Sequence, residues 1–158
     1  MSHKPRVKKL LIALAIIATA TATACGEGAC EGYEPSGSAN APSISQIRLV
    51  NQLNGDPWTS IFGLKFSDQN GDLGTENGYA QFFVNSKPQE LVTLLELFQG
   101  VGLSSSATSG ELAVPLRFSE NIKDGASATL GVQLIDKEGL RSNCYALELD
   151  FSVSSLSN

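Results

Sequence analysis

Apolar and polar residues alternate along most of the chain beyond residue 44. The clearest alternating runs are 47–49, 62–66, 112–118, 128–134 and 145–153, with a further aromatic-rich run at 79–84. A period of two places the apolar side chains on one face of a strand, which is typical of half-buried strands in antiparallel sheets. Turn-forming residues at 54–57 and 123–125 separate these runs. The pattern therefore predicts six or seven short strands in one all-β sandwich over residues 44–158.

Two local features refine this prediction. The first is a set of apolar residues spaced by three, four and seven, namely Leu91, Leu94, Leu95 and Phe98. With Pro88 before it and Gly100 after it, this spacing predicts a short amphipathic helix over residues 89–99 that crosses between the sheets. A buried strand is the alternative, because the apolar run is short. The second feature is Pro115, which lacks an amide hydrogen and so places its strand at a sheet edge or at a bulge.

The beginning of the chain has the order of residues that is typical of an export signal. Four basic residues within the first nine precede an apolar run at 10–18, and small residues follow as far as Ala24. This order predicts a secretory signal peptide over residues 1–24. The apolar run is shorter than the roughly 20 residues of a spanning helix, so an uncleaved membrane anchor is the less favoured alternative.

The residues around Cys25 resemble a bacterial lipobox, with Ala22 at the position where Leu is usual. The resemblance implies cleavage before Cys25 and attachment of lipid to its thiol, which would anchor the protein to a membrane. The sequence Ala22-Thr23-Ala24 is also an ordinary cleavage site, which would instead release a soluble protein. Residues 25–43, rich in Gly, Ser, Pro and acidic residues, predict a flexible tether between the anchor and the sandwich.

The number of cysteines, three, bears on whether Cys25 carries lipid. An odd number of cysteines in an exported chain calls for an explanation. If Cys25 carries lipid, Cys30 and Cys144 can form a disulfide, and we prefer this pairing because it would join the tether to the last strand. The alternative pairs Cys25 with Cys30 and leaves Cys144 buried.

Export also changes the charge and limits the chemistry of the chain. Cleavage after residue 24 removes four basic residues and His3, the only histidine, so the net charge falls from −5 to −9. An acidic chain of this kind is not a basic nucleic-acid binder. Without histidine it has no Ser-His-Asp or Cys-His unit and no His-ligated zinc site. A glycosidase that uses two carboxylates is the enzyme alternative, and we favour no catalytic activity.

Two stretches resemble immunoglobulin-like domains of bacterial surface proteins. Residues 132–143 (VQLIDKEGLRSN) resemble the last strand–turn–strand of such modules. Residues 66–74 (FSDQNGDLG) resemble the segment Phe-x-Asp-x-Asp-Gly-Asp-Leu/Ile-Gly of immunoglobulin-like domains in bacterial lipoproteins. The resemblance implies a single immunoglobulin-like sandwich, lipid-anchored at the outer membrane or cell surface, that binds an envelope or extracellular partner. A subunit of a larger envelope assembly is a related alternative.

One loop carries candidate metal ligands, namely Asp68, Asn70 and Asp72. Alternating oxygen-bearing side chains with Gly71 at the bend are how a loop can wrap Ca²⁺, which would make the domain a Ca²⁺-binding adhesion-type module. Such a site needs further oxygens, from Glu76 or Asp136. An Asx-rich hairpin loop without metal is the favoured interpretation, and no other cofactor is indicated.

Overall fold

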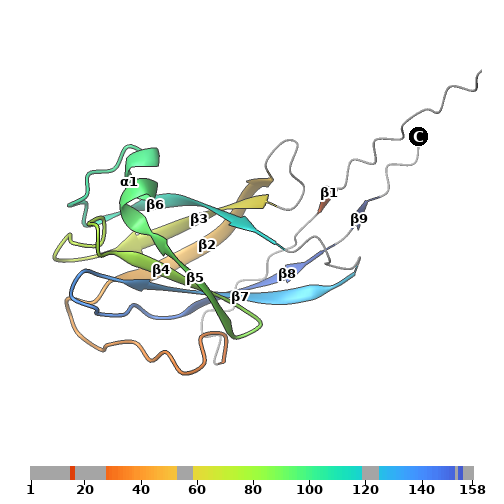
Figure 1. Cartoon of the computed structure of the whole chain (residues 1–158), viewed down its shortest axis with the longest axis horizontal. Helices are drawn as coiled ribbons and strands as arrows, with labels where there is room; N and C mark the ends of the chain where they lie inside the picture. The colour runs from red at the N-terminus through yellow and green to blue at the C-terminus, as the bar shows by residue number, and fades with distance from the viewer. Residues whose placement is uncertain (1–14, 17–27, 53–58, 119–124, 152, 155–158) are drawn as a thin grey trace, which may run out of the picture.

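The computed structural model describes residues 15–16, 28–52, 59–118, 125–151 and 153–154. Two antiparallel sheets form a sandwich (Figure 1). The three-stranded sheet has the order β2-β3-β6, with β2 at Ser43–Gln52, β3 at Thr59–Ser67 and β6 at Ser109–Arg117. The four-stranded sheet has the order β5-β4-β7-β8, with β5 at Lys87–Thr93, β4 at Tyr79–Val84, β7 at Ser127–Ile135 and β8 at Tyr145–Asp150. A separate short pair joins β1, Ala15–Ile16, to β9, Val153–Ser154.

The hydrophobic core lies between the two sheets, as the alternation predicts. One sheet contributes Phe62, Leu64, Leu112 and Val114, and the other contributes Ala80, Phe82, Leu130, Val132 and Leu134, all of them buried. Residues between them in sequence, such as Lys65, face outward and are exposed. Burying a side chain of the size of Leu or Phe contributes about 1.5–3 kcal/mol, so this inner face is the main source of the fold's stability.

The predicted helix begins later than its spacing suggests. Helix α1 spans Leu94–Gly100 and connects the four-stranded sheet to β6 of the other sheet, while residues 87–93 form strand β5. Leu91, which the helical spacing places on the apolar face, is 51% exposed. The reason is a two-residue hairpin at Asn85 and Ser86, whose φ angles of 50° and 64° fold β5 back onto β4. Neither residue is the glycine that usually marks such a turn.

The two lateral edges of the sandwich differ. At one edge β2 and β8 lie side by side, and Asn143 closes the junction by bonding both the N–H and the C=O of Ile44, at 2.8 and 3.0 Å. At the other edge lie β5 and β6, which belong to different sheets and are linked through α1. Pro115 lies in β6, an edge strand, as its missing amide hydrogen predicts.

Candidate functional site

A cleft of about 470 Å³ lies between the sheets at the edge formed by β5 and β6. Its described lining comes from four strands and the residue after β6, and consists of Phe82, Val84, Gln89, Val92, Leu116, Arg117, Phe118 and Leu130. The volume lies within the range of roughly 300–1,000 Å³ that is typical of small-molecule sites. The cleft therefore has the volume of a small-molecule site and lies at an edge of the hydrophobic core.

The cleft has an apolar floor and a polar rim. Phe82, Phe118 and Leu130 are buried, whereas Gln89 and Arg117 are exposed. The ring of Phe118 packs edge-on against Phe62 and Phe151, with centroid distances of 6.2 and 5.3 Å, so this wall is fixed by the core. A few polar groups around an apolar body are the usual means by which such sites orient a ligand.

The polar side chains at the rim come from the two edge strands. Gln89 lies at a register shift in β5, where its backbone carbonyl accepts a hydrogen bond from the Gln81 side chain at 2.6 Å and its own amide nitrogen donates to the Lys87 carbonyl at 2.9 Å. Arg117 ends β6 opposite Thr59 and supplies a positive charge. No carboxylate is among the described residues that line the cleft. The described lining therefore does not contain the pair of acids that a glycosidase requires.

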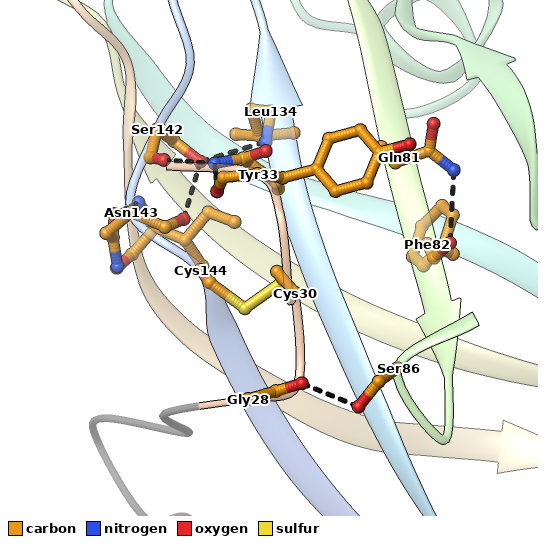
Figure 2. The surroundings of a disulfide bond; sticks show 12 residues. Gly28, Cys30, Tyr33, Gln81, Phe82, Ser86, Leu134, Ser142, Asn143 and Cys144 are labelled. Atoms are coloured by element: carbon orange, nitrogen blue, oxygen red, sulfur yellow. Dashed lines mark hydrogen bonds between the residues drawn. A yellow bond between two sulfur atoms is a disulfide. The ribbon is translucent and has the colours of Figure 1, made fainter. Parts of the chain in front are cut away.

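A second feature is the N-terminal segment that crosses the outer face of the four-stranded sheet. The structure contains the disulfide between Cys30 and Cys144, with Cα atoms 6.1 Å apart (Figure 2). The side-chain amide of Gln133 donates to the carbonyl of Tyr33 at 3.1 Å, and the Tyr33 ring packs against Phe83 at a centroid distance of 4.9 Å. Phe83 and Gln133 are completely buried on this outer face as a result.

The same segment is held at both of its ends. Near its start, the Ser86 hydroxyl donates to the carbonyl of Gly28, and farther along Ser36 exchanges two hydrogen bonds with Arg141 at 2.8 and 3.0 Å. The sequence predicts a flexible tether over residues 25–43, whereas residues 28–36 lie against the sheet. The composition is that of a linker, but the disulfide, the contact of the Tyr33 ring and several hydrogen bonds dock it on the sheet.

A third feature is a group of buried carboxylates at the end of the sandwich where β3 and β7 terminate. Asp68 follows β3, Asp72 lies in the connection from β3 to β4, and Asp136 follows β7. Their exposed fractions are 1%, 4% and 1%. Because β3 and β4 belong to different sheets, the loop from Asp68 crosses between the sheets and is not the hairpin that the sequence favours.

Each of these carboxylates uses one oxygen to shape its own loop. Asp68 Oδ2 accepts the N–H groups of Asp72 and Leu73 at 2.9 and 3.0 Å. Asp136 Oδ1 accepts the N–H groups of Glu138 and Leu140 at 2.9 and 2.8 Å. These paired bonds close Asx-type turns of the kind that Asp forms in loops.

Charged groups from both loops surround Asp72. Its Oδ2 accepts a hydrogen bond from the Asn70 side chain at 3.0 Å and lies 3.6 Å from Nζ of Lys137. Burial, followed by the negative charges of Asp136 and Asp68, raises the pKa of Asp72 above its usual value of 3.8, and Lys137 only partly opposes this. The structure thus brings Asp72 close to two other carboxylates that lie far apart in sequence.

The structure places the predicted metal ligands in different roles. Asp68 and Asp72 come together with Asp136, whereas Asn70 is exposed and acts as a donor to Asp72. Glu76, the other acidic residue considered, is exposed and is not among the charges that act on Asp72. Within the described ranges, no group of three or more His, Cys, Asp or Glu side chains has the ready-made arrangement of a metal site.

Some of the predicted features lie outside the described residues. Cys25, the candidate lipidation site, lies outside them, as do residues 1–14 and 17–24 of the predicted signal peptide. In the described part of the chain, no helix combines the length and the apolar character needed to cross a bilayer. The cleft is the feature that sequence reasoning missed, because no local pattern marks where two edge strands stand apart.

Comparison with known proteins bears on the fold. No protein-family model and no curated protein sequence matches the chain. The chain is similar to the crystal structure of a Niemann-Pick type C2 protein from Japanese carpenter ant, with a TM-score of 0.51 and 14% sequence identity over 75% of this chain and 97% of that chain. At this identity the similarity shows the fold alone. The domain is an immunoglobulin-like β-sandwich.

Proposed function

We propose that the chain is an exported, non-catalytic binding module of the bacterial cell envelope that holds the apolar part of a small amphipathic ligand between its two sheets. The observation that carries the proposal is the cleft of about 470 Å³ with its apolar floor and polar rim. A ligand in such a cleft gains affinity mainly from apolar area removed from water, while a few polar groups fix its orientation.

The lining favours one class of ligand. Phe82, Phe118 and Leu130 form an apolar surface without a hydrogen-bonding side chain, which suits an alkyl chain or a fused apolar ring. Arg117 at the rim adds a positive charge, which favours a carboxylate or phosphate at the other end of the ligand. We therefore propose an acyl chain with an anionic end group as the ligand class.

The proposed location rests on the N-terminal residues and on the disulfide. A Cys30–Cys144 disulfide persists in oxidising compartments, which supports export. Lipid on Cys25 would then hold the sandwich at the membrane, close to lipids and to envelope proteins. The measurement is the intact mass of the membrane-extracted protein, which should exceed that of residues 25–158 by the acyl groups. An unmodified mass, or unchanged membrane retention of Cys25→Ser, would argue against the anchor.

The ligand proposal is tested by calorimetric titration of the purified protein with dodecanoate. Val92 lines the cleft, whereas its neighbour Leu91 is exposed, so Val92→Trp and Leu91→Trp form a matched pair on one strand. We expect Val92→Trp to reduce affinity for dodecanoate at least tenfold, because the indole fills the cleft, and Leu91→Trp to bind normally. Equal binding by both variants would place the ligand elsewhere, and no binding by the unsubstituted protein would refute the ligand class.

The charge at the rim has its own control. Arg117→Gln should weaken binding of dodecanoate and leave binding of dodecanol unchanged, since only the acid presents an anion to Arg117. Arg48→Gln is the matched control, because Arg48 pairs with Glu111 on the three-stranded sheet at 2.6 Å and does not line the cleft. If the two arginine variants behave alike, the end group of the ligand does not face Arg117.

A further inference from the structure

The described range 28–52 begins beside the hairpin that joins β4 to β5. Its first residue, Gly28, accepts a hydrogen bond from the hydroxyl of Ser86, which is one of the two turn residues of that hairpin (Figure 2). The next residue, Ala29, lies over β7, because a Cβ at Gly131 would be 2.8 Å from the Ala29 carbonyl oxygen. The chain therefore enters the described domain at the β4–β5 hairpin.

This entry point is fixed by packing and by a covalent bond. Ala29 and Cys30 are buried, with exposed fractions of 5% and 7%. Gly131 has no side chain, so the backbone of the segment can lie directly on β7. The disulfide joins Cys30 to Cys144, the residue before β8. Two residues after Gly28 the chain is thus bonded to the sandwich.

The docked segment shortens the tether that the sequence predicts. Cys25, the candidate lipidation site, precedes Gly28 by three residues, which span at most about 11 Å. A flexible tether over residues 25–43 would have a root-mean-square length of roughly 20–25 Å and could extend to about 60 Å. An anchor on Cys25 would therefore lie next to the domain and not at the end of a long spacer.

We propose that the end of the sandwich that carries the β4–β5 hairpin is a membrane-contacting surface, held against the lipid bilayer by acyl groups on Cys25. The inference deepens the proposed function and rests on the lipid anchor that is part of it. Acyl groups on Cys25 lie in the bilayer, and the headgroup layer above them is only about 5–8 Å thick. Within a reach of about 11 Å, Gly28 and Ser86 lie at the headgroups.

The residues of the hairpin suit contact with an anionic lipid surface. Lys87 is the only charged residue in the segment 85–89, although the chain is acidic overall. Its side chain is exposed, and a lysine near an anionic membrane contributes about 1 kcal/mol of attraction. The exposed carboxylates Glu148 and Asp150 lie on β8, which β7 and β4 separate from β5.

The proposed cleft lies beside this surface. Val84, which lines the cleft, is the residue before the hairpin and pairs with Lys87 across it. A cleft at this position is close to the bilayer lipids, whose acyl chains belong to its proposed ligand class. A long spacer would hold the same cleft away from them.

The experiment measures which end of the domain approaches the lipid. The acylated protein is reconstituted into vesicles of phosphatidylethanolamine and phosphatidylglycerol that contain a lipid with a spin-labelled headgroup, and tryptophan quenching is recorded. Lys87→Trp reports on the hairpin. Lys65→Trp is the matched control, because Lys65 is an exposed lysine of β3 that lies roughly 20 Å along the strand from Thr59, the residue opposite Arg117 of the cleft. The native Trp58 is replaced by Phe in both proteins.

We expect Lys87→Trp to be quenched about threefold or more strongly than Lys65→Trp, because only the hairpin lies within reach of the anchor. The same Lys87→Trp protein with Cys25→Ser should lose the quenching, which shows that the anchor and not the new indole brings the hairpin to the lipid. If Lys87→Trp does not fold, Pro88→Trp is the substitute, because Pro88 is the next exposed residue.

Two insertions test whether the docked segment sets the orientation. About 15 Gly and Ser residues inserted after Gly26 lengthen the chain before Gly28 by roughly 20 Å. The same residues inserted after Gly37 follow the disulfide, so the distance from the anchor to the hairpin stays unchanged. We expect the first insertion to reduce the quenching of Lys87→Trp to the level of the control and the second insertion to preserve it.

Equal quenching of the two tryptophans, or equal effects of the two insertions, would overturn the orientation. Intact mass separates this failure from failure of the proposed function. A protein without acyl groups refutes the anchor and the inference together, whereas an acylated protein with equal quenching refutes the orientation alone. Dodecanoate titration of the same samples reports separately on the cleft.

Discussion

Removal of the Cys30–Cys144 disulfide should cost this domain a large part of its stability. The two cysteines are 114 residues apart, so nearly the whole sandwich lies within the closed loop. The perturbation is the double substitution Cys30→Ala and Cys144→Ala in a Cys25→Ser background, which leaves the chain without a thiol. The Cys25→Ser protein is the matched reference, because it keeps the disulfide and lacks only the third cysteine.

The magnitude follows from the length of the loop. In the chain-entropy model, a cross-link over this number of residues restricts the unfolded chain by about 4.8 kcal/mol at 25 °C. A typical domain is stable by about 5–15 kcal/mol, so the loss would be a third or more of the total. The N-terminal segment keeps its contacts through Tyr33 and Ser36, but it must now be held by non-covalent interactions alone.

The assay is guanidinium unfolding of both proteins, followed by circular dichroism. We expect the free energy of unfolding of the double variant to fall by about 3–5 kcal/mol, because strain and residual structure reduce the ideal value. Reduction of the reference protein should produce the same change. A loss below about 1 kcal/mol in both experiments would show that the disulfide does not restrict the unfolded chain in the way the reasoning requires.

Two further predictions concern the loops. A Cβ at Gly78 would lie 1.7 Å from the carbonyl oxygen of Leu73, whereas one at Gly100 meets nothing within 4 Å. In thermal unfolding, Gly78→Ala should therefore lower the stability by about 1–3 kcal/mol or more, and Gly100→Ala should be neutral or slightly stabilising. Equal effects of the two substitutions would contradict this packing. Burial, followed by the charge of Asp136, raises the pKa of Asp72 above 3.8, so its contribution to stability is largest below pH 3.8 and is lost as the pH rises through the raised value. In EDTA, Asp72→Asn should therefore gain stability relative to the unsubstituted protein as the pH increases from 3 to 7, and a constant difference would disprove the shift.

Much of the fold could be predicted from local patterns, and the failures have identifiable causes. Alternation at 62–66 and 128–134 predicts strands because one face of each is buried, and the observed core confirms it. The spacing of apolar residues predicts a helix at 89–93, which lies in β5, because that spacing allows both structures. The pairing of β5 with β4 decides between them, and it depends on a turn at Asn85 and Ser86 that carries no glycine.

The candidate sites, like the fold, could be predicted only in part from the sequence. The sequence identifies Asp68 and Asp72 as oxygen ligands from their spacing around a glycine, but it offers Asp136 only as one of two additional donors. Which one joins the group depends on where β3 and β7 end in the sandwich. The cleft has no sequence signature, because it arises where edge strands of two sheets stand beside each other without pairing.

By itself the sequence determined the features that each residue carries locally: the period of two, the turns, the acidic charge, the absence of histidine beyond residue 3 and the cysteines available for pairing. The tertiary structure decided which distant residues meet, namely the docking of residues 28–36 on the sheet, the cleft at the β5–β6 edge and the grouping of three carboxylates. The physical reason is that local preference depends on neighbours in sequence, whereas burial and unpartnered charge depend on packing between elements that are far apart along the chain.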